Sequence, residues 1–431
     1  MHITIVICAL FLGIHIYGAT SLPLSGEEAY YWTWSQHWSW GYWHHPPMIA
    51  YGIGMATTIF SKTEIGVRFF GIFLHVISSY LLSTKTQKPN QSLLLFLTLP
   101  GLALAGMEAH PQIYFFSFFA LTLWAWLSKH WVLMGIFLSF CFLSATSSLA
   151  LIPFLGLLWT LVPQYRKKLS VAFIIGFIGS LPWFLWLLFH NALPLGLLYN
   201  LKPVSFIISG LDLFFYVGCI AFAPILQPKD QEQKFTWAIS LFLVLSTLTI
   251  SPQFMGIGWG VAGVLYVCHR FPDRFISVLL GIHMFMFAVQ KINLHRPLLA
   301  SDVHIAQKYN GGAILADAVQ AWGIEHVWTT SPFDAAWIRF YSNIQAHTNG
   351  KLGSESQFDL WKKPFPNYGL LVQEDSRFFS IANYSFSDIQ TITSYADSHT
   401  EGDFIQTHQW NTAIFQLSSS TDVVSPNNDA D

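Results

Sequence analysis

The sequence between the first two apolar segments reads Ser25-Gly26-Glu27-Glu28-Ala29-Tyr30-Tyr31-Trp32-Thr33-Trp34-Ser35-Gln36-His37-Trp38-Ser39-Trp40-Gly41-Tyr42-Trp43-His44-His45-Pro46-Pro47. Eight of the seventeen residues from 27 to 43 are Trp or Tyr, which prefer the interface between membrane and water. Ser25 followed three residues later by Glu28 forms a capping box, which predicts a helix start. Because proline lacks an amide donor and restricts the residue before it, the His-His-Pro-Pro end predicts where the helix stops. We expect an interfacial helix in the headgroup layer.

The ionisable residues of this stretch have different expected roles. The capping box gives Glu28 a structural role, whereas Glu27 lies in the first turn, where the helix dipole favours a carboxylate. Glu27 is therefore either a solvated first-turn acid or a side chain that points toward a ligand. The aromatic residues favour a membrane anchor over a surface for sugar stacking. His44 and His45 would bind a metal only with a third ligand, because adjacent side chains diverge on regular structure.

Charge is distributed unevenly along the 431 residues. Only 10% of them are Asp, Glu, Lys or Arg, against about 25% in a soluble domain. Residues 1–292 hold 22 of the 44 charged side chains, so this part is predicted to be a membrane domain and residues 293–431 a globular one. A net charge of -2 without a basic block excludes a nucleic-acid partner. All four cysteines lie in apolar runs, which excludes a disulfide framework: Cys8, Cys141, Cys219 and Cys268.

About eleven apolar runs are long enough to cross a hydrocarbon layer of about 30 Å, or are close to that length. The first lacks a basic n-region and a good cleavage site, so we expect it to be retained rather than cleaved. The stretch 131–163 is either two helices or one bent helix, and only two helices keep the number of membrane spans odd. The runs lie at 3–21, 65–83, 91–107, 111–128, 131–145, 148–163, 169–190, 205–226, 235–251, 255–268 and 275–291.

Basic residues predict the orientation of these spans. With the N-terminus in the cytoplasm, ten of the fourteen Lys and Arg residues before residue 293 fall in cytoplasmic connections. An odd number of spans then places residues 293–431 outside. In that part, the patterns predict helices at 313–319 and 334–341, strands at 326–330, 368–372 and 412–417, and a frayed end after about residue 418. The predicted fold class is an all-α membrane domain with a C-terminal α/β domain.

The first loop also resembles a known family. The family pattern is close to D-E-A-Y-Y-W-x-W-S-Q followed by G-Y-x-D-H-P-P, found in bacterial membrane glycosyltransferases of the GT-C fold. These enzymes are similar to the protein O-mannosyltransferases and to the aminoarabinose transferase of lipid A. The residues that carry the resemblance are Glu27-Glu28-Ala29-Tyr30-Tyr31-Trp32, Trp34-Ser35-Gln36, Gly41-Tyr42, His45-Pro46-Pro47, Gly66-Val67-Arg68-Phe69-Phe70, Phe340-Tyr341 and Ser356-Gln357-Phe358-Asp359-Leu360-Trp361.

The resemblance implies inverting transfer of a sugar from a polyprenyl-phosphate carrier to an acceptor outside a bacterial cytoplasmic membrane. The acceptor would be lipid A or lipopolysaccharide, another envelope glycan, or a protein. Glu27 takes the position of the family's catalytic acid and would be the base. No cofactor is firmly implied, but a divalent metal bound through His44 is compatible with the pattern. His45, Arg68 and Lys202 are expected to lie near the donor phosphate. The residues expected to bind substrate are Glu28, Tyr31, His44, His45, Arg68, Glu108, Gln112 and Lys202.

The sequence departs from the family pattern at several points, three of which concern acidic positions of that pattern. The leading Asp is Glu27, and the acid before His-Pro-Pro is His44. A later Pro-Asp is replaced by Pro111-Gln112, for which Glu108 is a possible substitute. These losses leave two alternatives open. One is a catalytically impaired relative that binds lipid-linked sugar, and the other, suggested only by the number of spans, is a transporter or flippase.

Overall fold

The computed structural model describes residues 2–99, 108–191, 264, 268, 272–295, 308–309, 311–348, 352, 355–361, 363, 368–374, 384–397 and 404–417. The chain divides into two compact units. The helical unit consists of Met1–Leu22 and Trp34–His295, and the sheet unit of Pro23–Thr33 and Arg296–Asp431. Residues 23–33 of the first loop thus belong to the same unit as the C-terminal residues. Whether these units are the membrane and extracytoplasmic domains stays a prediction.

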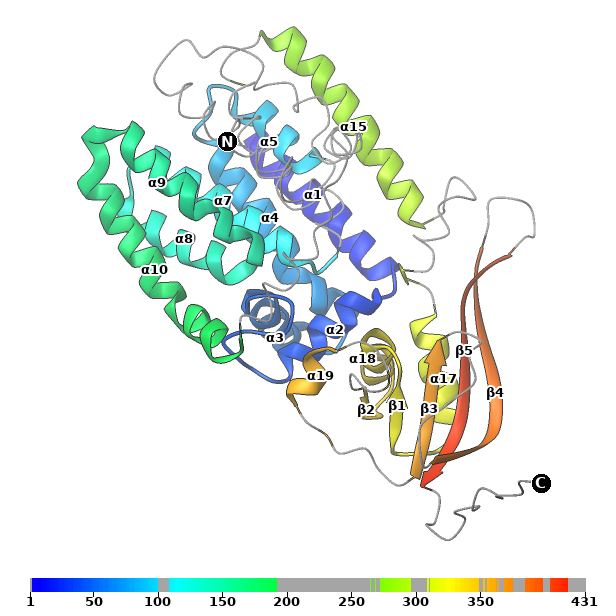
Figure 1. The fold of residues 1–431 in the computed structure, drawn as a ribbon. Coiled ribbons are helices and arrows are strands. Elements are labelled where there is room, and N and C mark those ends of the chain that lie inside the picture. The colour runs from blue at the N-terminus through cyan, green and yellow to red at the C-terminus, as the bar shows by residue number, and fades with distance from the viewer. Residues whose placement is uncertain are drawn as a thin grey trace, which may run out of the picture. The chain divides into compact units, whose positions relative to one another are not determined.

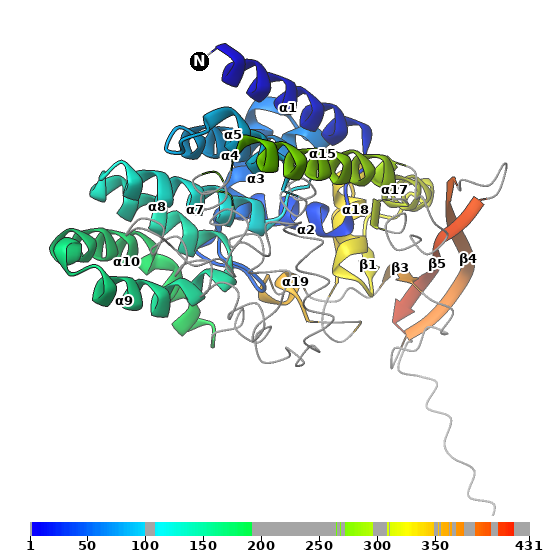
Figure 2. The ribbon, with the colours of Figure 1, turned by 90° about the horizontal axis from the view of Figure 1, so that it is seen from above.

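In the helical unit, α1, α4, α7, α8 and α10 pack in succession, each against the next (Figures 1 and 2). By length and apolar composition, three described helical segments could cross a membrane: Ile3–Ser21, Glu64–Ser83 and Pro163–Phe189. Other described helices are apolar but shorter. The α-helices described in this unit are α1 (His2–Ser21), α3 (Met48–Phe60), α4 (Glu64–Ser83), α5 (Pro89–Thr98), α7 (Pro111–Leu127), α8 (Trp131–Ser144), α9 (Leu151–Leu161), α10 (Arg166–Phe189) and α15 (Asp273–His295).

Several predicted spans coincide with helices in the described part of the chain. The stretch 131–163 forms two helices, α8 and α9, because the backbone is extended at Ala145 and continues into a short 3-10 helix, Thr146–Ala150. The predicted runs 205–226 and 235–251, and nearly all of 255–268, lie outside the described residues. The number of spans and the side on which each terminus lies therefore stay predictions.

Residues 22–64, predicted to be an outer loop, contain α3, a helix that was not predicted from the sequence; their place outside the membrane stays a prediction. With 13 residues, α3 is too short to cross a membrane alone, but it packs against α4, α7 and α8. Gly52 allows this close approach, since a Cβ at that position would overlap the ring of Tyr114 on α7.

The sheet unit contains a five-stranded sheet with the strand order β2-β1-β3-β5-β4. Strand β1 is parallel to β2 and β3, whereas β5 is antiparallel to β3 and β4. All five predicted elements of this part are confirmed, but β2, α19 and β4 were not predicted. The elements are α17 (Gly312–Ala321), β1 (Val327–Thr329), α18 (Pro332–Tyr341), β2 (Ala346–His347), α19 (Gln357–Leu360), β3 (Tyr368–Glu374), β4 (Tyr384–Asp397) and β5 (Phe404–Leu417).

Helix α18 carries a buried acid in its first turn. Asp334 is 1% exposed, and burial, with the nearby charge of Glu374, raises its pKa to about 7. Trp410 and His408 act in the opposite direction but do not compensate. Because the folded chain binds this proton more tightly than the unfolded chain, folding stability falls as the pH rises from about 4 to about 7.

Replacing Asp334 by Asn should therefore make the chain more stable at pH 8 and change little at pH 4. The gain at pH 8 is at most about 4 kcal/mol, because the Asp334 pKa rises from 3.8 to about 7 and each pKa unit corresponds to about 1.4 kcal/mol. Thermal unfolding of the full chain in detergent at both pH values measures it. Asp317→Asn, at an exposed acid on α17, is the control and should have no pH-dependent effect. An equal effect of Asp334→Asn at both pH values would contradict the assignment.

Candidate functional site

The predicted capping box is present at the start of α2 (Gly26–Ser35). The backbone N–H of Ser25 donates to Oε2 of Glu28 at 2.9 Å, and the N–H of Glu28 donates to Oγ of Ser25 at 3.2 Å. The Glu28 side chain is 1% exposed. Its carboxylate is thus engaged in holding the helix start. Whether it also binds substrate stays a prediction.

Glu27 differs from its neighbour in exposure. It occupies the same first turn, where exposed amide groups favour a negative charge, but its side chain is partly exposed. Its carboxylate makes no hydrogen bond or ion pair with any residue that the structure describes. An exposed, positioned carboxylate of this kind can accept a proton from a bound hydroxyl.

The segment that carries Glu27 is fixed within the sheet unit on both sides. Before α2, the hydroxyl of Tyr341 accepts the N–H of Leu24 at 2.7 Å, and Nε1 of Trp337 donates to the Leu24 carbonyl at 2.9 Å. Within α2, the hydroxyl of Tyr30 accepts the N–H of Gln357 at 2.6 Å.

Aromatic packing supports these hydrogen bonds. The Tyr30 ring stacks on Phe358, with 6.0 Å between centroids and 17° between planes. Trp32 meets Phe340 edge to face at 5.2 Å. The predicted substrate residue Tyr31 is 6% exposed and lies against the Tyr30 ring.

The prediction of one interfacial helix through the aromatic stretch is wrong. Helix α2 ends at Ser35, and the Tyr42 hydroxyl donates to the carbonyls of Trp34 and His37 beyond that end. The Tyr42 ring stacks on Trp34 with 4.8 Å between centroids and 4° between planes. Five of the eight aromatic residues are buried in the protein rather than available to lipid: Tyr30, Tyr31, Trp32, Trp34 and Tyr42. Trp38 and Trp40, by contrast, are 66% and 56% exposed.

A group of histidines follows in the helical unit. Burial lowers the pKa of His44 to about 4. Burial, with His110 and His44 nearby, holds the pKa of His45 well below its usual 6.5. Both rings are therefore neutral at pH 7 and act there as hydrogen-bonding groups rather than cations. The His44 carbonyl accepts a hydrogen bond from Oγ1 of Thr146 at 3.4 Å.

The start of α7 borders this histidine group. Nδ1 of His110 accepts the N–H of Gln112 at 3.3 Å and so caps the helix. Gln112 is 4% exposed, and its buried Oε1 has no hydrogen-bond partner among the described residues. Glu108 lies just before this cap and is partly exposed. Within the described ranges, no three His, Cys, Asp or Glu side chains are placed to hold a metal, so a metal on His44 would need other ligands.

Arg68 has a defined partner in the helical unit. Its side chain is 1% exposed, and Nη1 donates to the carbonyls of Ala19 at 2.8 Å and Leu22 at 2.7 Å. These carbonyls lie at the C-terminal end of α1, where the helix itself supplies no donor. Arg68 therefore caps α1. Its predicted contact with a donor phosphate stays a prediction, and Lys202 lies outside the described residues.

The predicted site residues are divided between the units. Glu27, Glu28 and Tyr31 belong to the sheet unit, and the structure brings His44, His45 and the start of α7 together in the helical unit. The contacts of Leu24 with Trp337 and Tyr341 were not predicted from the sequence. One signal was available, because the first loop, Phe340-Tyr341 and residues 356–361 resemble the same family in the same order.

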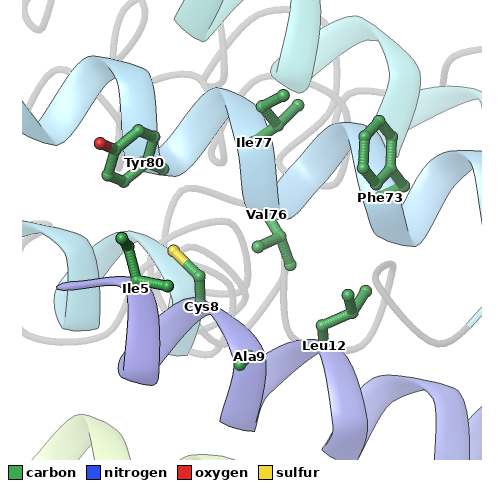
Figure 3. Close-up of a pocket in the computed structure, with 8 residues that line it drawn as sticks. All are labelled: Ile5, Cys8, Ala9, Leu12, Phe73, Val76, Ile77 and Tyr80. Atoms are coloured by element: carbon green, nitrogen blue, oxygen red, sulfur yellow. The ribbon is translucent and has the colours of Figure 1, made fainter. Parts of the chain in front are cut away.

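An apolar groove lies between α1 and α4 (Figure 3). Its volume is about 280 Å³, and side chains of both helices line it. Such a lining suits an alkyl or isoprenoid chain rather than a polar ligand. The lining residues are Ile5, Cys8, Ala9, Leu12, Phe73, Val76, Ile77 and Tyr80.

Comparison with known proteins supports the predicted fold. No protein-family model matches the chain. A curated relative, lipid A galacturonosyltransferase RgtD of Rhizobium johnstonii, is 23% identical over 331 residues, which are 67% of this chain and 70% of RgtD. The crystal structure of ArnT from Cupriavidus metallidurans in the apo state superposes with a TM-score of 0.62 at 13% identity, covering 86% of this chain and 92% of ArnT. ArnT bound to undecaprenyl phosphate gives a TM-score of 0.61, also at 13% identity, over 86% and 93%. The chain thus has an ArnT-like GT-C fold, and its resemblance to lipid-linked-sugar glycosyltransferases is confirmed.

Proposed function

We propose that this chain is an integral membrane glycosyltransferase that transfers a sugar from a polyprenyl-phosphate carrier to an acceptor of the bacterial envelope. The main support is the likeness to ArnT along most of both chains, together with the likeness to RgtD. One ArnT structure contains undecaprenyl phosphate, and RgtD is a lipid A transferase. These relatives favour a lipid-phosphate donor, and lipid A or lipopolysaccharide over other envelope glycans and proteins as the acceptor.

The proposed reaction is a single displacement at the anomeric carbon of the donor sugar. An acceptor hydroxyl oxygen forms a bond to that carbon, and the bond from the carbon to the phosphate oxygen breaks. The hydroxyl proton moves to the Glu27 carboxylate, and the polyprenyl phosphate leaves with its electron pair. One displacement inverts the configuration and needs one base, unlike the two carboxylates of retaining hydrolases. The partly exposed carboxylate of Glu27 supports this role.

Two further features support the binding of a lipid-linked donor. The groove between α1 and α4 has the apolar lining that a polyprenyl chain requires. The neutral rings of His44 and His45 offer hydrogen bonds to polar groups without adding charge at pH 7. A metal, if one takes part, would supply charge neutralisation at the leaving phosphate.

The catalytically impaired relative remains a second candidate because the group of His44, His45 and Gln112 lacks the acids of the family pattern. Purified full chain in vesicles, supplied with labelled polyprenyl-phosphate sugar and lipid A, separates the alternatives. The proposal expects labelled lipid A and free polyprenyl phosphate. Donor binding without turnover would favour the impaired relative, and movement of the carrier across the vesicle without transfer would favour a transporter.

A further inference from the structure

We propose that α18 positions the catalytic base, with Tyr341 and Trp337 as positioning residues that hold the backbone in front of Glu27. This inference rests on the proposed function, because it assumes that Glu27 is the base. It assigns to the sheet unit a direct part in the reaction.

The first observation is the double hydrogen bond at Leu24. Its N–H and its carbonyl are both satisfied by side chains of α18, at 2.7 Å from Tyr341 and 2.9 Å from Trp337. These two side chains lie one turn apart on the helix and hold the two peptide groups on either side of the Leu24 Cα. Trp337 is 3% exposed, so water does not readily replace its hydrogen bond.

The second observation is the close approach of the two helix starts. A Cβ at Gly26 would lie 2.8 Å from Cβ of Phe333, which is closer than real side chains come. Phe333 is the second residue of α18, and Ser331 caps that helix by accepting the Phe333 N–H at 3.2 Å. The first turn of α2 thus packs directly on the first turn of α18. Gly26 is needed here for space.

The third observation is that Glu27 lies midway between two residues that are hydrogen-bonded to the C-terminal part of the chain. Leu24 lies three residues before it and Tyr30 three residues after it, and both are hydrogen-bonded to residues of the C-terminal part. The capping box of Ser25 and Glu28 then sets the direction of the helix between them. Glu27 therefore occupies the middle of a segment that is fixed at both ends while its own side chain remains accessible.

Such anchoring affects the chemical step more than binding. A base displaced by about 1 Å from the hydroxyl it serves loses up to about a hundredfold in rate. Lipid-donor binding does not depend on this alignment. Loss of an anchor should therefore lower kcat and leave KM for the donor unchanged, which a purely structural role in folding would not do.

Tyr341→Phe and Tyr30→Phe test the proposal because each removes one hydroxyl and keeps the ring. We expect kcat to fall about tenfold in each variant, with KM for the donor within about twofold of wild type. Amide exchange of the peptide covering residues 22–33 should become about tenfold faster in Tyr341→Phe, which removes the acceptor of the Leu24 N–H. Tyr368→Phe, at a 45% exposed tyrosine of β3, is the matched control and should change neither quantity.

The outcomes separate this inference from the base assignment. Unchanged exchange in Tyr341→Phe would show that the anchor does not hold the loop and would overturn the inference. Faster exchange with an unchanged kcat would overturn the positioning role. Full activity of Glu27→Gln would instead refute the base, whatever the exchange shows. Gly26→Ala gives a second test of helix contact, and wild-type kcat in a folded Gly26→Ala variant would count against the proposal.

Discussion

Glu27→Gln should lower the rate of sugar transfer about a thousandfold while the protein remains folded. Glutamine has nearly the same shape but cannot accept the proton of the acceptor hydroxyl, and general-base catalysis typically contributes 10²–10⁴-fold. The stability of the fold should change little, because the Glu27 side chain is partly exposed and lies outside the capping box. The measurement is kcat for transfer by purified protein at saturating donor.

Glu28→Gln is the matched control, since the two acids are adjacent in the same helix turn. The amide oxygen of glutamine can still accept the N–H of Ser25, so the capping box is retained. We expect kcat of this variant to fall far less than that of Glu27→Gln, because Glu28 is not the proposed base, and a raised KM would indicate the substrate contact predicted for Glu28. If Glu28→Gln were the inactive variant and Glu27→Gln the active one, the assignment of the two roles would be reversed.

Arg68→Met should cause the largest loss of stability, about 3 kcal/mol in the free energy of unfolding. The methionine fills much of the space, but the carbonyls of Ala19 and Leu22 lose a charged donor in a buried environment. A buried acceptor left without a partner costs about 1–3 kcal/mol. Unfolding of the full chain in detergent, followed by temperature or denaturant, measures the loss.

Arg274→Met supplies the control for this substitution. Arg274 is an exposed residue in the first turn of α15, and such surface changes usually stay within about 0.5 kcal/mol. Comparison of Arg68→Met with Arg274→Met also distinguishes the two roles considered for Arg68, which are the cap of α1 and the contact with the donor phosphate. Normal stability of Arg68→Met together with lost donor binding would favour the phosphate contact over the cap of α1.

The local features of the structure were predictable from sequence. The capping box at Ser25 and the entry of α18 through Ser331 depend on residues within four positions of each other, and both are present. Strands β1, β3 and β5 followed from short apolar patterns in the same way. Features of this kind are encoded by neighbouring residues, so a single sequence is sufficient to find them.

Features that depend on distant residues were not predictable. Composition alone cannot distinguish a Trp or Tyr that is buried in protein from one that faces lipid. Trp34 and Tyr42 were therefore predicted to lie at the membrane interface, although both are buried in the protein. The end of α2 depends on the Tyr42 hydroxyl. The anchor at Leu24 joins residues 317 positions apart in the chain. No periodicity within the first loop encodes that pairing.

The configuration of the transferred sugar tests the central claim most directly. Purified protein, a donor of known anomeric configuration and a defined acceptor are allowed to react, and the new glycosidic bond is assigned by NMR. A single displacement with Glu27 as the one base predicts the opposite anomeric configuration in the product. Retention of the donor's configuration would require a covalent sugar–enzyme intermediate and would contradict the account.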